Sequence, residues 1–102
     1  MDARRYLTGL VGKTIFTWAG QPNKVLAIDG DGVRVAGAKS QAGAMVPIAW
    51  VQAGLDLLET KGEVTIDSAT LGHRSDFVGA VILSMPDVVR VESTPPKARR
   101  SR

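Results

Sequence analysis

Residues 62–86, GEVTIDSATLGHRSDFVGAVILSMP, decide the fold class of this chain. They begin with a short β-branched stretch, residues 64–66, which is typical of a strand. A polar turn follows, and residues 77–85 are then apolar on nearly every side. Because a helix that is apolar all round is a buried helix, we expect residues 76–85 to form a core helix beside a sheet.

The head of this expected helix is polar: His73, Arg74, Ser75 and Asp76 stand directly before the apolar run. A helix N-terminus exposes free N–H groups and a partial positive charge, and it therefore attracts phosphate and other anions. Two interpretations are open. The tip is a ligand-binding site strengthened by Arg74 and His73, or it is an ordinary helix start in which Ser75 or Asp76 is the N-cap.

The remaining segments predict an α+β fold, with a small antiparallel sheet or partial barrel and two main helices in a single domain. Asp-Gly at residues 29–32 predicts a hairpin turn, and Gly62 predicts the end of the other main helix. The expected elements are a short helix or arm (2–10), strands (13–18, 24–28, 33–38, 64–66 and 88–91), a turn (20–23), a Gly-containing loop (39–44), a turn or short helix (68–72) and the main helices (48–61 and 76–85).

The aromatic side chains divide between core and surface. Phe16 and Trp50 are predicted to be core residues, Phe16 on one face of a strand and Trp50 on the apolar stripe of a helix. Trp18 ends its strand and precedes the polar turn Gly-Gln-Pro-Asn. We therefore expect Trp18 to be available to a ligand, although its alternation with Phe16 would also place it in the core.

The positive charge is unevenly distributed. Residues 95–102 hold four of the thirteen basic residues and no acidic one, and we expect a basic, disordered tail or linker there, following a domain at residues 1–94. Within that domain, residues 1–24 carry Arg4, Arg5, Lys13 and Lys24 against Asp2 alone. Two interpretations are open. The asymmetry gives the domain one face that attracts a polyanion, or these cations are ordinary solvated surface residues.

Composition excludes several classes of protein. The chain has no cysteine and one histidine, so disulfides, thiolate chemistry and Cys- or His-rich metal sites are excluded, and we expect neither a metal nor a cofactor. No apolar run reaches the length of a membrane span, and the N-terminal stretch lacks the apolar segment of a signal peptide; we expect a cytoplasmic protein. No P-loop, dinucleotide fingerprint or EF-hand spacing is present, which favours a binding module over an enzyme.

Two stretches together resemble a known family: GQPNKVLAIDGDGVRVAGAKSQAGAMVPIAWVQ at residues 20–52 and GEVTIDSATLGHRSDFVGAVILSMPDVVRVESTPP at residues 62–96. They are similar to the N-terminal DNA-recognition domain of actinobacterial McrA-like HNH restriction endonucleases, which are modification-dependent. The family pattern has a Pro-Asn turn, a hairpin, an Arg-Ser loop, a Val-Pro-Ile helix start, a Tyr-Arg-Ser-x-Phe helix head and a closing Pro-Pro. Here Lys39-Ser40 replaces Arg-Ser and His73 replaces the tyrosine. A lysine keeps the charge but loses the planar fork of arginine.

The resemblance implies a targeting module that binds double-stranded DNA carrying a modified base, 5-methylcytosine above all, and that is joined to a C-terminal HNH nuclease domain absent from this chain. Trp18 would stack on the modified base, with Gln21 or Asn23 supplying polar contacts. The alternatives are a protein-interaction domain and a nonspecific DNA-binding accessory domain. The candidate DNA contacts are Arg4, Arg5, Lys13, Trp18, Gln21, Asn23, Lys24, Lys39, Ser40, His73, Arg74 and Ser75.

Overall fold

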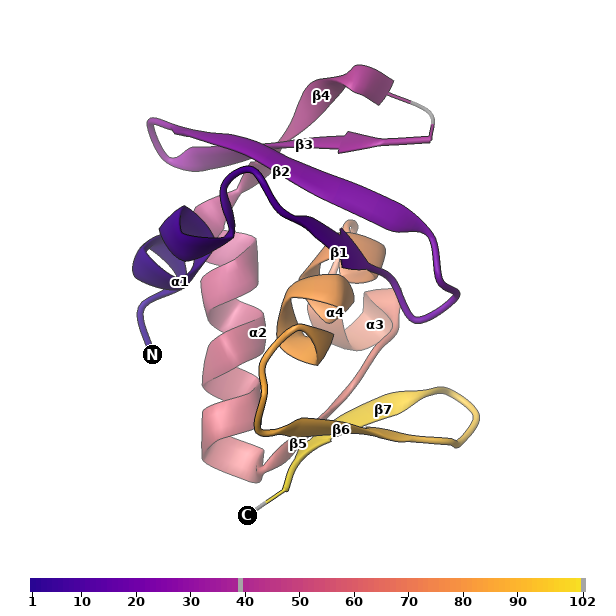
Figure 1. Ribbon diagram of the computed structural model, residues 1–102. Helices are drawn as coiled ribbons and strands as arrows, with labels where there is room; N and C mark the ends of the chain where they lie inside the picture. Colours follow the sequence, from indigo (N-terminus) through magenta and orange to yellow (C-terminus); the bar gives the residue numbers. More distant parts are fainter. Residues whose placement is uncertain (39, 102) are drawn as a thin grey trace.

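The computed structural model describes residues 1–38 and 40–101 and has three layers: a sheet, a layer of helices and a second sheet (Figure 1). The two sheets are antiparallel, with strand orders β1-β2-β3-β4 and β5-β7-β6. The elements in chain order are α1 (Ala3–Leu10), β1 (Thr14–Phe16), β2 (Pro22–Asp29), β3 (Gly32–Gly37), β4 (Ser40–Pro47), α2 (Ile48–Lys61), β5 (Glu63–Thr65), α3 (Ser68–Leu71), α4 (Ser75–Leu83), β6 (Val88–Val91) and β7 (Lys97–Arg100). The predicted single-domain α+β class is confirmed, and in the described part neither sheet closes into a barrel.

Helix α2 has the bounds that the sequence predicts. Gly62 takes the left-handed conformation, with φ of 76°, and its N–H donates to the carbonyl of Leu58. Such a conformation is easiest for glycine, so the helix ends there. The prediction that Trp50 is a core residue is wrong: 39% of Trp50 is exposed, because the buried stripe of α2 runs along Ile48, Val51, Leu55 and Leu58.

Helix α4 is the buried helix that its apolar sequence predicts, and Phe77 through Ile82 are all buried. Two glycines let it approach its neighbours closely. A Cβ at Gly79 would lie 2.6 Å from Ile66 Cγ2, and a Cβ at Gly54 of α2 would lie 2.7 Å from Val78 Cγ1. Both distances are shorter than real side-chain contacts, so α4 packs at a spacing that only glycine permits.

We expect Gly54→Ala to destabilise the fold by about 1–3 kcal/mol, because the added methyl group must displace Val78 in a packed core. The matched control is Gly9→Ala in α1, where nothing lies within 4 Å of the added Cβ. Alanine favours the helix over glycine by up to about 1 kcal/mol, so the control should be neutral or stabilising. Urea unfolding of both variants tests the pair. A neutral Gly54→Ala would contradict the close approach of α2 and α4.

Two segments that the sequence predicts as connections between strands belong, at least in part, to strands in the structure. Residues 39–44 were expected to be a loop, but β4 begins at Ser40, and Ala44 pairs with Val35 of β3. Small residues favour a loop locally, yet the free edge of β3 offers hydrogen-bond partners that outweigh this preference. The expected turn at 20–23 also lies earlier: Gly20 N–H donates to the Thr17 carbonyl, and β2 already starts at Pro22.

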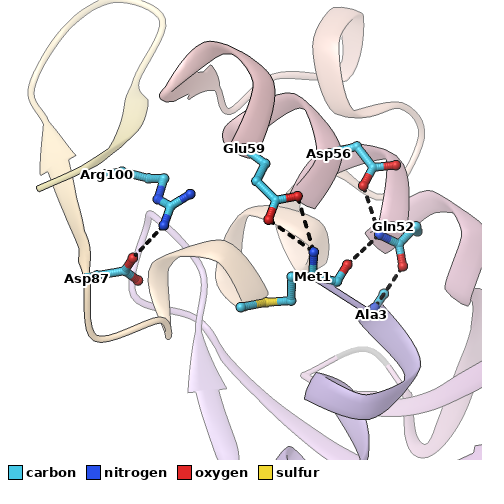
Figure 2. A network of polar contacts seen from close by, with 7 residues as sticks. All are labelled: Met1, Ala3, Gln52, Asp56, Glu59, Asp87 and Arg100. Atoms are coloured by element: carbon cyan, nitrogen blue, oxygen red, sulfur yellow. Dashed lines mark hydrogen bonds and ion pairs between the residues drawn. The ribbon is translucent and has the colours of Figure 1, made fainter. Parts of the chain in front are cut away.

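The expectation of a disordered tail at residues 95–102 is contradicted by β7, which is the central strand of the second sheet. It pairs with β5 on one side and β6 on the other. Ala98 is buried beneath the sheet, while Arg100 forms an ion pair of 3.4 Å with Asp87 (Figure 2). The charges of β7 had suggested disorder, but alternation along the strand turns Lys97 and Arg99 away from the buried face of Ala98, and Arg100, on the face of Ala98, is paired with Asp87.

Polar contacts at the N-terminal end of α1 join this helix to α2 (Figure 2). Gln52 Nε2 donates to the Met1 carbonyl at 2.7 Å, and Gln52 Oε1 accepts from the Ala3 N–H at 2.8 Å. The terminal ammonium group of Met1 lies 3.1 Å from the Glu59 carboxylate. These contacts fix the orientation of α1 and therefore the positions of its arginines.

Candidate functional site

A cleft of about 700 Å³ lies between the ends of β2, β3 and β4 and the N-terminus of α4; we call it the α4 cleft. It brings together five of the residues that the sequence predicts for a binding site: Gln21, Asn23, Ser40, His73 and Arg74. Its apolar lining includes Pro22, Val35 and Ala44. The cleft therefore combines hydrogen-bonding groups with an apolar surface, the combination typical of small-ligand sites.

Asn23 is the most deeply placed polar residue of the α4 cleft, with 6% of its surface exposed. It lies on the inner face of β2, next to Val25 in the alternation of the strand, where the core ends and the cleft begins. Its Nδ2 donates to the Gln21 carbonyl at 3.4 Å. Within the described residues Oδ1 accepts no hydrogen bond and keeps some contact with solvent, so Asn23 offers a free acceptor to the cleft.

The head of α4 does not have the N-cap that its sequence suggests. Arg74 is the N-cap residue and makes no side-chain capping bond, so the prediction that Ser75 or Asp76 caps this helix is wrong. Arg74 Nε instead lies 3.3 Å from Asp76 Oδ1. The carboxylate stabilises the N-terminus through the helix dipole and offsets the arginine, which leaves the cleft polar rather than strongly cationic.

His73 lines both the α4 cleft and a smaller depression of about 370 Å³ between α2 and α3. Its ring meets the exposed ring of Trp50 edge-on, with 6.4 Å between the ring centroids. Trp50 was not predicted as a site residue. The available signal was its position, since it lies off the helical spacing that joins Ile48, Val51 and Leu55.

Trp18 lies outside the lining of the α4 cleft, although Thr17 and Ala19 on either side of it are part of that lining. Its ring packs against the core and is covered by the Arg90 guanidinium, which is 4.0 Å from the ring centroid. Arg90 also donates to the Trp18 carbonyl at 3.0 Å.

The prediction that Phe16 is a core residue is wrong, because 57% of Phe16 is exposed. Ile15 occupies the inner face of β1, and the alternation of the strand turns Phe16 outward.

The basic residues of the first 24 positions lie elsewhere. Arg4 reaches the β2–β3 turn, where it donates to the Gly30 carbonyl at 2.8 Å and lies 3.5 Å from Asp31. This turn is at the opposite end of β2 from Asn23. Arg5, Lys13 and Lys24 are exposed. Ser75 begins α4 without lining the cleft, and Lys39 lies outside the described residues.

Comparison of the chain with protein-family models, curated proteins and solved structures finds no significant match. In the described part of the chain, no three His, Cys, Asp or Glu side chains are grouped as a metal site. None of the helices described is long and apolar enough to cross a membrane.

Proposed function

We propose that this chain is a DNA-binding module that recognises modified DNA, with 5-methylcytosine as the modified base. It would act as the targeting domain of a modification-dependent restriction endonuclease whose HNH nuclease lies in a separate domain. The proposal is carried by one observation: Gln21, Asn23, Ser40, His73 and Arg74, chosen from three separate segments of the sequence, line one cleft.

The chemistry of the α4 cleft suits a methylated base. 5-Methylcytosine presents hydrogen-bonding groups beside an apolar methyl group. The cleft offers amide, hydroxyl and guanidinium groups close to Pro22, Val35 and Ala44. A base held there would be read along its polar edge, while its methyl group would lie against the apolar residues.

Phosphate contacts would come from the exposed cations. Arg5, Lys13 and Lys24 are exposed and make no ion pair within the described residues. Cations of this kind supply affinity that is independent of base sequence and that falls steeply as the salt concentration rises. In this proposal the cleft supplies the preference for the modification, and the exposed cations supply general affinity.

A protein-interaction domain is the second candidate, and it is favoured by the exposed ring of Phe16. This ring borders a groove between β1, α4 and β6 that is also lined by Leu83, Val88 and Arg90. Exposed aromatic side chains beside a groove are common in protein interfaces. A protein with this role alone would show no DNA affinity that depends on modification.

A gel shift with four matched duplexes tests the proposed function. The duplexes are unmodified or carry 5-methylcytosine, 5-hydroxymethylcytosine or phosphorothioate, each at two salt concentrations. We expect the tightest binding to the 5-methylcytosine duplex and weaker binding to every duplex at the higher salt concentration. Equal, weak binding to all four would reject the recognition of modified DNA.

Arg74→Ala should lower the affinity for 5-methylcytosine DNA by about 1–3 kcal/mol, because Arg74 would contact a phosphate or a base edge from the cleft. The melting temperature should change little, since a partly exposed ion pair such as Arg74–Asp76 contributes about 0–1 kcal/mol. Arg99→Ala, on the exposed face of the second sheet, removes the same charge away from the cleft and serves as the control. Equal affinity losses in the two variants would show that only overall charge matters.

A further inference from the structure

We infer that Asn23 is the residue that distinguishes 5-methylcytosine from thymine, by accepting a hydrogen bond from the 4-amino group of the cytosine. The inference rests on the proposed function and specifies how its site selects the base. The two bases carry the same 5-methyl group, so apolar contacts alone cannot separate them. They differ at position 4, where cytosine has an amino donor and thymine a carbonyl acceptor.

The orientation of the Asn23 amide follows from its neighbours. The Gln21 carbonyl is an acceptor, and it therefore faces the Nδ2 donor, at 3.4 Å. This leaves Oδ1 on the side of Gly37, where a Cβ built on Gly37 would lie 3.8 Å from it. Gly37 also lines the α4 cleft and leaves this oxygen uncovered. On the side of Gly37, Asn23 thus presents an acceptor to a ligand.

The low exposure of Asn23 and the cover that a bound base would add give this acceptor its selectivity. Only 6% of the residue is exposed, so water has little access to Oδ1 once a base fills the cleft. A bound base would cover Oδ1, and an acceptor that is covered without receiving a donor is costly, so the site would strongly reject a ligand that cannot pair with it. The 4-amino group of cytosine would satisfy Oδ1, whereas O4 of thymine would place two acceptors against each other.

The same geometry defines how the base reaches the site. Asn23 lies at the floor of a cleft rather than on a protruding loop, so a base can contact it only after rotating out of the double helix. In that position the 5-methyl group would meet the apolar lining formed by Pro22, Val35 and Ala44. Asn23 would then set the choice between pyrimidines, and the apolar lining would set the preference for the methyl group.

The test compares wild-type protein with Asn23→Leu and Asn23→Ala on three duplexes that share one sequence. The variable position holds 5-methylcytosine, cytosine or thymine, each opposite guanine. We expect the wild type to prefer 5-methylcytosine over thymine by about 10- to 100-fold. Either folded variant should bring this ratio to within about twofold, while it keeps a preference for 5-methylcytosine over cytosine.

A fourth duplex tests the inference on the wild-type protein alone, without any effect of a substitution on folding. It carries 5-methyl-2-pyrimidinone, which keeps the methyl group and lacks the 4-amino group. This base pairs weakly with guanine and leaves the stack easily, so a loss of affinity of about tenfold or more relative to 5-methylcytosine would reflect the missing hydrogen bond.

The outcomes separate the two ideas. A wild-type protein that binds cytosine and 5-methylcytosine duplexes equally overturns the proposed function, and the inference with it. A wild type that prefers 5-methylcytosine over cytosine but binds the thymine or pyrimidinone duplex equally well overturns the inference alone. So does an Asn23 variant that still rejects thymine.

Discussion

A chain truncated after Thr94 should lose its cooperative thermal unfolding transition. The deletion removes β7, which hydrogen-bonds to β5 and to β6, so both remaining strands of this sheet would lose their partner. Each backbone hydrogen bond contributes about 0.5–1.5 kcal/mol, and a domain of this size is stable by only about 5–15 kcal/mol. The loss of the backbone hydrogen bonds of β7 to β5 and to β6, together with the buried Ala98, is therefore enough to unfold the protein. Circular dichroism during heating measures the transition.

The control for this truncation keeps the strand and removes its charge. Lys97→Gln together with Arg99→Gln leaves the backbone of β7 intact and breaks only the partly exposed Lys97–Glu63 ion pair. Such pairs contribute about 0–1 kcal/mol, so the melting temperature should change little. If the truncated chain melted cooperatively near the temperature of the full chain, β7 would be dispensable, as the prediction of a disordered tail implied.

Phe77→Ala should destabilise the fold by about 3–5 kcal/mol, because removal of the phenyl ring leaves a large cavity in the core. Phe77 is 0% exposed and is the largest of the fully buried side chains in the described part of the chain. For a domain of this size, this loss corresponds to a melting temperature lower by at least about 12 °C. Phe77 also belongs to the first turns of α4, next to Arg74 and Asp76, so the proposed binding of DNA should weaken together with stability.

Phe16→Ala is the matched control, since it is the same chemical change at a residue that is 57% exposed. We expect a destabilisation below about 1 kcal/mol, as is usual for surface substitutions. Urea unfolding of the two variants under the same conditions compares them directly. A loss at Phe16 as large as that at Phe77 would contradict the outward orientation of Phe16 in β1.

Elements with a strong local signal were predicted well. The bounds of α2 and β6 agree with the prediction, and the Asp-Gly turn between β2 and β3 lies where it was expected. Gly62 ends α2 and the apolar run of α4 is buried. These features depend on backbone conformations and on apolar patterns within a few residues of each other, which a sequence contains in full.

The candidate site was predictable only in parts. Asn23, Ser40 and Arg74 could each be selected as polar residues near turns or helix ends, but nothing local indicates that they share a cleft. The aromatic residues show the same limit. Phe16 and Trp50 were assigned to the core because of their hydrophobicity, yet the buried face of a strand or helix is set by what packs against it.

The amino-acid sequence by itself determined the fold class, the two main helices and the hairpin, because helix ends, tight turns and apolar periodicity are local properties of the chain. Only the tertiary structure decided that residues 97–100 form the central strand of a sheet and that the end of β2 meets the head of α4 in a cleft. The physical reason is that a short basic segment has no intrinsic preference strong enough to form a strand. It becomes one because β5 and β6 lie on either side of it and supply its hydrogen-bond partners.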